Sequence, residues 1–131
     1  MTQTSTEIVE GFFADVNAGE FESAFGRMAA DAEFWIAGRE WSVGGTYDRD
    51  GVMAVTTGKI APALAGPLKI TIIGITAQGE RVAVETETTA PTTSGVPYNN
   101  QYHFLFVVRD GAIVQVKEYQ DTLHASRVIG P

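Results

Sequence analysis

The chain has 131 residues, of which 44% are hydrophobic and 19% charged, and its 16 acidic residues outnumber 9 basic ones. The net charge of −7 and the scattered basic residues exclude nucleic acids and anionic membrane surfaces as expected partners, since both need concentrated positive charge. No cysteine is present, which excludes disulfides, thiol nucleophiles and cysteine-ligated metals. This length fits a single domain with a buried core.

Targeting and cofactor signals are also missing from the sequence. Residues 1–10 lack the basic start and apolar run of a signal peptide, and no stretch has the apolar length of a membrane-spanning helix. We therefore expect a soluble, cytoplasmic protein. The two histidines, His103 and His124, are not accompanied by clustered carboxylates, and no phosphate loop, dinucleotide fingerprint or nucleophile elbow occurs. We expect no metal and no cofactor.

Apolar periodicity predicts three helices in the first half of the chain, over residues 4–17, 20–28 and 49–60. The clearest apolar stripe belongs to the first helix and consists of Ile8, Val9, Phe12, Phe13 and Val16. A short strand is expected at residues 32–36, between the second and third helices.

Strands dominate the second half of the chain. Residues 68–77 and 81–90 are expected to pair around a turn at 78–79, and residues 96–121 form a longer hairpin. That hairpin turns at Asp110-Gly111, which is the strongest short-range hairpin signal. Helices followed by antiparallel strands predict an α+β fold. We expect a cone in which three N-terminal helices pack on a long curved, mainly antiparallel β-sheet and enclose a pocket, with residues 124–131 as a loose tail.

A regular ladder from the Asp110-Gly111 turn would place His103 opposite Glu118, beyond the apolar pairs Val107–Val114 and Leu105–Val116. All of these side chains would share one face of the sheet. A neutral imidazole can accept a proton near pH 7, and an adjacent carboxylate would orient it, so this pair is the leading acid–base candidate. The alternative is a polar pair that only contributes about 0.2–1 kcal/mol to the sheet.

The opposite face of the same hairpin would be mixed and aromatic. It would carry Tyr102, Phe104, Phe106, Val108, Ile113, Gln115, Lys117 and Tyr119. A large exposed apolar patch usually marks an interface, so we expect a homodimer through this outer sheet face. A register slip of one residue would exchange the two faces.

Three segments carry a family resemblance: the Gly-Thr-Tyr run at 45–47 before the third helix, the turn residues 109–113, and residues 118–122. Together with the three helices they resemble the SnoaL-like branch of the nuclear-transport-factor-like superfamily. That superfamily also holds ketosteroid isomerase, limonene epoxide hydrolase and polyketide cyclases. The resemblance covers nearly the whole chain, so we expect residues 1–131 to form a single domain of this kind, and it implies the fold more strongly than any one reaction.

Residue matches to ketosteroid isomerase are few. Phe12 stands where that family has its oxyanion-binding tyrosine, and Ile36 stands where it has its aspartate base. His103 stands where a protonated carboxylic acid donates to the oxyanion. The resemblance therefore implies an isomerase without its usual base and tyrosine.

The epoxide hydrolases and polyketide cyclases offer other matches. Arg81 and Glu118 match the arginine and one aspartate of the hydrolase relay, whereas Ala83 replaces the second aspartate. The cyclases place an acid–base residue in the same cavity, where His103 or Glu118 could serve.

We therefore expect a cofactor-free isomerase or cyclase that transfers protons on an apolar, ketone-bearing substrate of steroid, polyketide or terpenoid type. Its expected catalytic residues are His103 and Glu118. The expected substrate-binding residues are Phe12, Phe34, Ile36, Asn99, Gln101, Leu105, Val116 and Gln120. The alternatives are a non-catalytic module that binds a hydrophobic ligand or an assembly partner and, third, an epoxide hydrolase-like enzyme.

Overall fold

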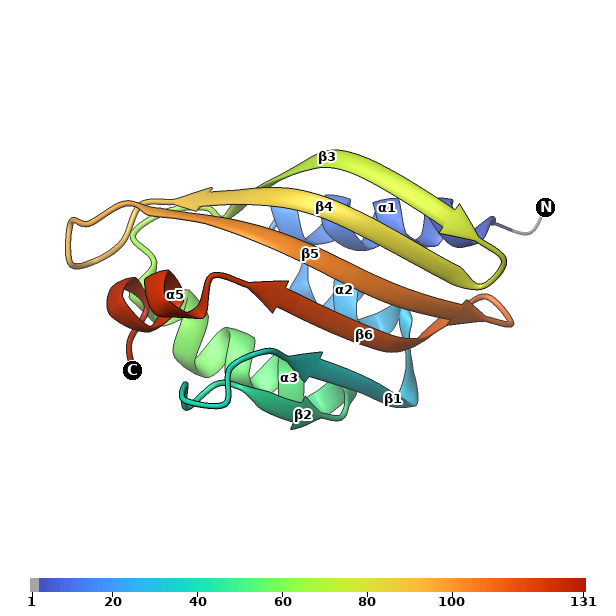
Figure 1. Cartoon of the computed structure of the whole chain (residues 1–131), viewed down its shortest axis with the longest axis horizontal. Coiled ribbons are helices and arrows are strands. Elements are labelled where there is room, and N and C mark those ends of the chain that lie inside the picture. Colours follow the sequence, from blue (N-terminus) through green and yellow to red (C-terminus); the bar gives the residue numbers. More distant parts are fainter. Residues whose placement is uncertain (1–2) are drawn as a thin grey trace.

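A curved six-stranded sheet wraps around the N-terminal helices in the computed structural model, which describes residues 3–131 (Figure 1). Residues 1–2, the start of the N-terminal stretch considered above, lie outside the described residues. The helical elements are α1 (Ser5–Asn17), α2 (Phe21–Gly26), α3 (Arg49–Val55), the π-helical turn η1 (Thr56–Ile60), α4 (Ala61–Ala63) and α5 (Thr122–Val128). The strands are β1 (Met28–Ile36), β2 (Gly45–Tyr47), β3 (Lys69–Gln78), β4 (Arg81–Ala90), β5 (Tyr98–Arg109) and β6 (Ala112–Gln120).

The strand order is β2-β1-β6-β5-β4-β3, and neighbouring strands are antiparallel except for the parallel pair β1–β6. Helices α1, α2 and α3 all lie on one side of this sheet (Figure 1). We call the side that faces them the inner face and the opposite side the outer face. The predicted α+β cone is confirmed.

Helix α1 begins at a capping box. The Thr4 hydroxyl accepts from the Glu7 N–H at 3.1 Å, and the Glu7 carboxylate accepts from the Thr4 N–H at 3.0 Å. The apolar stripe predicted for this helix is buried, with Ile8, Val9, Phe12, Phe13 and Val16 all facing the sheet core. The cap and the stripe together fix which side of α1 packs on the inner face.

The β5–β6 hairpin turns at Asp110-Gly111, as predicted, and both residues have positive φ, 52° and 79°. Arg109 pairs with Ala112 and Val108 with Ile113, but the next pair is Val107 with Gln115. Val114 is therefore an extra residue in β6, which makes a β-bulge. Beyond the bulge every predicted partner on β6 is displaced by one position.

The predicted His103–Glu118 pair is consequently wrong. His103 pairs with Tyr119 and Glu118 with Phe104, so the imidazole and the carboxylate point to opposite faces. The bulge has a packing reason. Ile113 and Val116 are three residues apart, so regular alternation would place one of them outside, yet both are fully buried.

The residues of β5 therefore lie on the opposite faces of the sheet from those expected. Phe104 and Phe106, predicted to form an outer interface, are core residues that contact α1. The ring centroids of Phe13 and Phe104 lie 5.2 Å apart, and those of Phe12 and Phe106 lie 5.6 Å apart. The assignment of a dimer interface to these phenylalanines is wrong, whereas the homodimer itself stays a prediction.

The C-terminal residues are ordered rather than loose. Asp121 caps α5 by accepting from the His124 N–H at 3.1 Å, and His124 Nε2 accepts from the Asn99 N–H at 3.1 Å. Beyond the helix, the Trp41 indole N–H donates to the Gly130 carbonyl at 2.7 Å. Helix α5 lies beside one end of β5 and β6 (Figure 1). These contacts keep the C-terminal segment against the end of the sheet, which corrects the expected loose tail.

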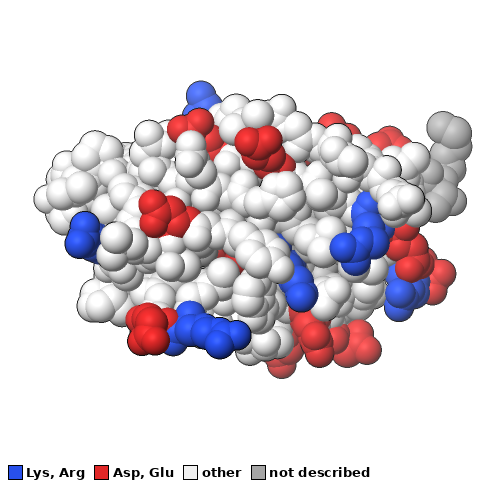
Figure 2. All heavy atoms as spheres, viewed as in Figure 1, with Lys and Arg blue, Asp and Glu red and all other residues white. Residues whose placement is uncertain are grey.

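Charged side chains on the outer face are scattered and of both signs (Figure 2). No positive patch gathers on this face, in keeping with the composition. Within residues 3–131, no helix combines the length and the apolar character needed to cross a membrane.

Candidate active site

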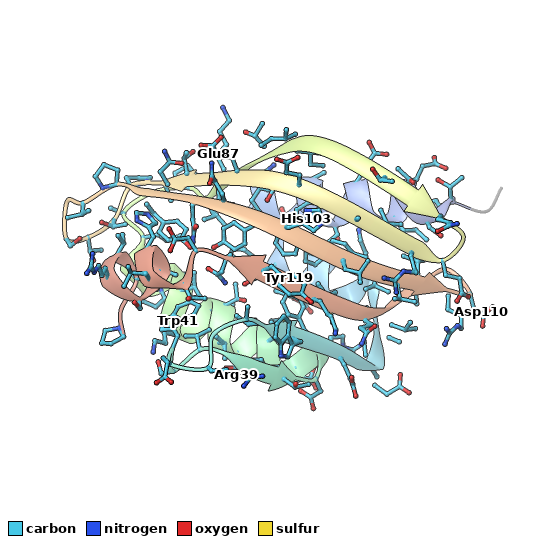
Figure 3. All side chains as sticks on the ribbon, in the orientation of Figure 1. Arg39, Trp41, Glu87, His103, Asp110 and Tyr119 are labelled. Carbon is cyan, nitrogen blue, oxygen red and sulfur yellow. The ribbon has the colours of Figure 1, made fainter. Side chains whose placement is uncertain are left out.

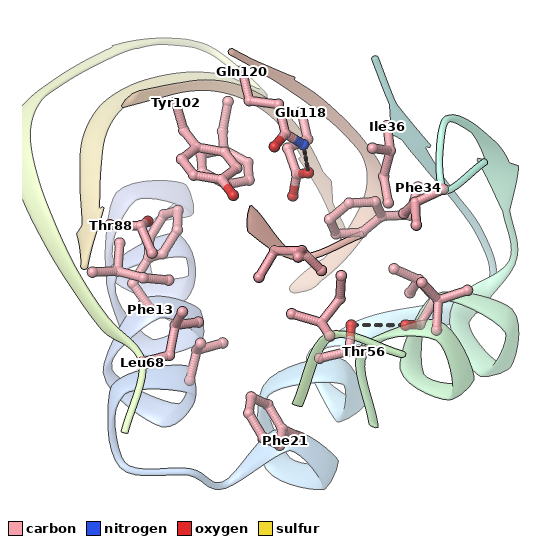
Figure 4. A pocket seen from close by; sticks show the side chains of 18 of the residues that line it. Phe13, Phe21, Phe34, Ile36, Thr56, Leu68, Thr88, Tyr102, Glu118 and Gln120 are labelled. Atoms are coloured by element: carbon pink, nitrogen blue, oxygen red, sulfur yellow. Dashed lines mark hydrogen bonds between the residues drawn. The ribbon is translucent and has the colours of Figure 1, made fainter. Parts of the chain in front are cut away.

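An apolar cavity of about 110 Å³ lies between the inner face and the helices (Figure 4). Aromatic rings from α1, α2 and β1 form much of its wall, including Phe12, Phe25 and Phe34. Side chains of η1, among them Thr56 and Ile60, line it too, and so does Ile129 after α5. The cone expected from the order of helices and strands thus encloses a pocket.

Polar groups gather at one part of the wall, where Tyr102 of β5 meets Glu118 and Gln120 of β6. All three residues are inward-facing positions of their strands. Figure 4 shows the Tyr102 hydroxyl and the Glu118 carboxyl group pointing into the same space. A donor and a titratable group therefore face one ligand position inside an otherwise apolar cavity.

Glu118 has an unusual electrostatic environment. Burial raises the pKa of its carboxyl group from the ordinary 4.5 to about 8, because the surrounding apolar side chains replace water. The Gln120 amide Nε2 donates to Glu118 Oε2 at 2.6 Å, which supports the carboxylate but does not outweigh its desolvation. A carboxyl group with this pKa can both release and accept a proton near neutral pH.

Two tyrosine hydroxyls form a hydrogen-bonded pair beside this carboxyl group. The hydroxyl groups of Tyr98 and Tyr102 bond to each other, and the Asn100 amide Nδ2 donates to the Tyr98 oxygen at 2.8 Å. Burial raises the pKa of Tyr98 to about 12 and the pKa of Tyr102 well above its ordinary 10. Both tyrosines therefore stay protonated at neutral pH and serve as hydrogen-bond donors.

Five of the residues predicted for the site line this cavity, namely Phe12, Phe34, Ile36, Glu118 and Gln120. Val116 also faces inward but is fully buried in the core and is not part of the cavity wall. The structure thus brings the β6 carboxyl group and amide together with the aromatic wall from α1 and β1.

Four predicted site residues lie on the other side of the sheet. His103, Asn99, Gln101 and Leu105 alternate with the inward-facing residues of β5 and point outward. His103 and Tyr119 are seen on the outer face in Figure 3, and His103 lines an open depression there with Glu85. Their placement in the pocket was wrong because the prediction omitted the bulge.

The sequence analysis missed the polar residues that β5 contributes to the site, Tyr98, Asn100 and Tyr102. A signal for them was present. Phe104 and Phe106 are strongly apolar, and counting back from them in steps of two along β5 reaches Tyr102, Asn100 and Tyr98. Had these phenylalanines been assigned to the core, the same alternation would have placed all three polar residues on the inner face.

Within residues 3–131, no group of three or more histidine, aspartate or glutamate side chains converges to hold an ion.

Comparison with known proteins gives a consistent fold. The family model of the SnoaL-like domain matches residues 9–116. An NTF2-like protein of unknown function from Burkholderia pseudomallei K96243 superposes with a TM-score of 0.86 at 16% identity, covering 99% of this chain and 100% of that one. A search of curated proteins finds no match.

Two other solved structures are similar over most of their length. IdmH, a proposed polyketide cyclase from Streptomyces antibioticus, has a TM-score of 0.76 at 22% identity, with 93% of this chain and 95% of that one covered. TerC, co-crystallised with polyporic acid, has a TM-score of 0.82 at 19% identity, with 95% and 97% covered. At these identities the likeness establishes the fold alone.

Proposed function

Because this chain belongs to the SnoaL-like domain family, we propose that it is a cofactor-free enzyme of isomerase or cyclase type. It acts by general acid–base proton transfer on an apolar, ketone-bearing substrate, and Glu118 is the group that carries the proton. The observation that supports this most is the desolvated Glu118 carboxyl group beside the Tyr102 hydroxyl in an apolar cavity. His103 has no part in it, since it lies on the outer face.

The chemistry follows from the two groups. The substrate carbonyl oxygen accepts a hydrogen bond from Tyr102, and the Glu118 carboxylate removes a proton from the adjacent carbon. The C–H electron pair becomes the enolate double bond, and the negative charge that develops on oxygen is stabilised by Tyr102. In an isomerisation Glu118 returns the proton to another carbon. In a cyclisation the enolate carbon bonds to a second carbonyl carbon, and the resulting alkoxide takes the proton from Glu118.

The cavity size restricts what can enter. An apolar cavity of roughly 150 Å³ is known to hold benzene, so about 110 Å³ is too small for a polycycle and takes in no more than part of a ketone-bearing ring. We propose that the rest of a steroid-, polyketide- or terpenoid-like substrate extends past Ile129, which lines the cavity from the C-terminal segment. Replacing Ile129 by alanine should then favour larger ring systems.

Deuterium exchange tests the proposal directly. Small cyclic ketones are incubated with the protein in D₂O, and loss of the α-proton signal is followed by NMR. We expect catalysed exchange whose kcat/KM rises about tenfold per pH unit and levels off above pH 8, because the active form is the carboxylate. Ketones that bind but show no exchange above the background rate would rule the proposal out.

A non-catalytic module that binds a hydrophobic ligand is the second candidate. The apolar side chains of Phe12 and Ile36 favour it, since both line the cavity where ketosteroid isomerase has polar groups. Ligand binding without exchange at any pH would support this function instead.

The epoxide hydrolase alternative has less structural support. Arg81 and Ala83 pair with Val107 and Leu105 on the outer face, so neither side chain reaches the cavity. A cytoplasmic location stays a prediction.

A further inference from the structure

Asn100 lies at the centre of the hydrogen bonds behind the cavity, although it does not line the cavity itself. It is 1% exposed and sits on the inner face of β5. Its Nδ2 donates to the Tyr98 hydroxyl at 2.8 Å, to Gln120 Oε1 at 3.3 Å and to the Asp121 carbonyl at 3.1 Å, while its Oδ1 accepts from the Gln101 N–H at 2.8 Å.

These partners fix which end of the amide is which. The Asp121 carbonyl can only accept, and the Gln101 N–H can only donate. A flipped Asn100 amide would bring its oxygen to the Asp121 carbonyl and its N–H groups to the Gln101 N–H, losing both bonds. The two Nδ2 protons of Asn100 therefore stay on the side of Tyr98, Asp121 and Gln120, where one of them is shared between two acceptors.

The bond to Tyr98 gives the tyrosine pair a direction. Either hydroxyl of this pair can be the donor, and the Asn100 N–H on the Tyr98 oxygen favours the arrangement in which Tyr98 donates to the Tyr102 oxygen. The Tyr102 proton is then left for the cavity, into which this hydroxyl points (Figure 4). Each bond in such a chain strengthens the next by polarising it.

The bond to Gln120 gives the second direction. Because Gln120 Oε1 accepts from Asn100, the other end of that amide, Nε2, faces Glu118 Oε2 at 2.6 Å. A donor on Oε2 stabilises the carboxylate and leaves Oε1 as the oxygen that exchanges a proton with a ligand.

We propose that Asn100 is a positioning residue that sets the hydrogen-bond direction of both polar groups of the cavity, so that Tyr102 donates into it and Glu118 is held by a donor. The use of these hydrogen-bond directions in catalysis rests on the proposed function. The directions themselves can be measured without any turnover.

Asn100→Asp is the sharpest variant because it keeps the shape of the side chain and replaces its donors by an acceptor. The new carboxylate would accept from Tyr98 and from the Gln120 amide. Both series of hydrogen bonds, to Tyr102 and to Glu118, would then run in the opposite direction. Tyr102 would then donate to Tyr98, and Gln120 would present its oxygen to Glu118. Asn99→Asp, on the exposed outer face of the same strand, introduces the same charge and is the matched control.

Two measurements report the two directions. The Glu118 carboxyl group is titrated by ¹³C NMR in glutamate-labelled protein, with its signal identified by its absence in Glu118→Gln. We expect its pKa to rise by about 1 or more in Asn100→Asp and to stay unchanged in Asn99→Asp. The affinity for 4-fluorophenol, whose oxygen accepts from Tyr102, should fall at least about tenfold in Asn100→Asp alone.

Single-direction variants separate hydrogen bonding from added charge. Tyr98→Phe should lower 4-fluorophenol affinity without moving the Glu118 titration, and Gln120→Met should raise the Glu118 pKa while leaving Tyr102 as a donor. In a Gln120→Met background, Asn100→Asp should raise the Glu118 pKa by less than it does in the wild-type protein.

The proposal is overturned if Asn100→Asp matches Asn99→Asp in both measurements. If Asn100→Asp does not fold, Tyr98→Phe and Gln120→Met test the proposal instead. The proposal fails if Tyr98→Phe does not lower 4-fluorophenol affinity and Gln120→Met does not raise the Glu118 pKa. A wild-type protein that binds 4-fluorophenol but exchanges no ketone proton would count against the proposed function and leave the role of Asn100 standing.

Discussion

Strands β5 and β6 carry a titratable group on each face, Glu118 on the inner face and His103 on the outer face. By residue type His103 is the more conventional acid–base group near pH 7. The structure nevertheless favours Glu118, because its carboxyl group is enclosed by apolar side chains that raise its pKa to about 8. His103 is exposed. The two faces differ because the helices enclose one of them, and this enclosure is the reason that the proposed function assigns the proton transfer to Glu118.

The largest expected difference between the faces is in activity. Glu118→Gln should lower the kcat/KM of ketone exchange by about 10²–10⁴-fold, because the proton-transferring group is lost while the shape is retained. His103→Gln should leave kcat/KM within about twofold. The measurement is the D₂O exchange assay on both variants and the wild type. Equal losses in the two variants would contradict the assignment of chemistry to the inner face.

Stability should differ between neighbouring residues of β5. Phe106→Ala removes a fully buried ring that packs on α1 and should lower the free energy of unfolding by about 3–5 kcal/mol. Leu105→Ala removes a half-buried side chain on the outer face and should cost about 1 kcal/mol. Urea unfolding followed by circular dichroism measures both. A larger loss for Leu105→Ala would mean that the faces are assigned in reverse.

The pH dependence of stability offers a continuous test, with a smaller change at each pH unit. The Glu118 carboxyl group ionises near 4.5 when unfolded but keeps its proton to about pH 8 when folded. The unfolded state thus binds fewer protons between these values, and this group should lower the free energy of unfolding by roughly 1 kcal/mol per pH unit in that window.

Glu118→Gln should remove this decline, whereas Glu85→Gln, on the exposed outer face, should retain it. Urea titrations at pH 5, 6, 7 and 8 would show the difference. A wild-type decline that persists in Glu118→Gln would show that the carboxyl group is not desolvated.

Substitutions on the outer face are expected to change ligand binding in the cavity least. The predicted homodimer, if it forms through this face, must use residues such as Leu105, Trp35 and Tyr119 rather than Phe104 and Phe106. Tyr119 is 43% exposed, and its ring centroid lies 5.0 Å from the ring centroid of Trp35. Leu105→Glu should halve the mass measured by light scattering and leave 4-fluorophenol affinity within about twofold. A wild-type mass of one chain would contradict the dimer.

Much of the architecture was predictable from local signals. The apolar stripe of α1 and the Asp110-Gly111 turn each depend on residues within a few positions of one another, and both are confirmed. The order of helices and strands predicted the α+β cone for the same reason. In the site, Glu118 and Gln120 were selected correctly as residues that reach the cavity, although their partners were not.

The sequence by itself determined most of the elements, though not β2 or α5, and the turn between β5 and β6, because propensity, periodicity and turn chemistry act over short distances. The tertiary structure alone decided which face of that hairpin meets the helices. Burying both Ile113 and Val116 against the core requires an extra residue, Val114, in β6. Since strand side chains alternate with a period of two, that one residue moved His103 out of the site and left Glu118 inside it.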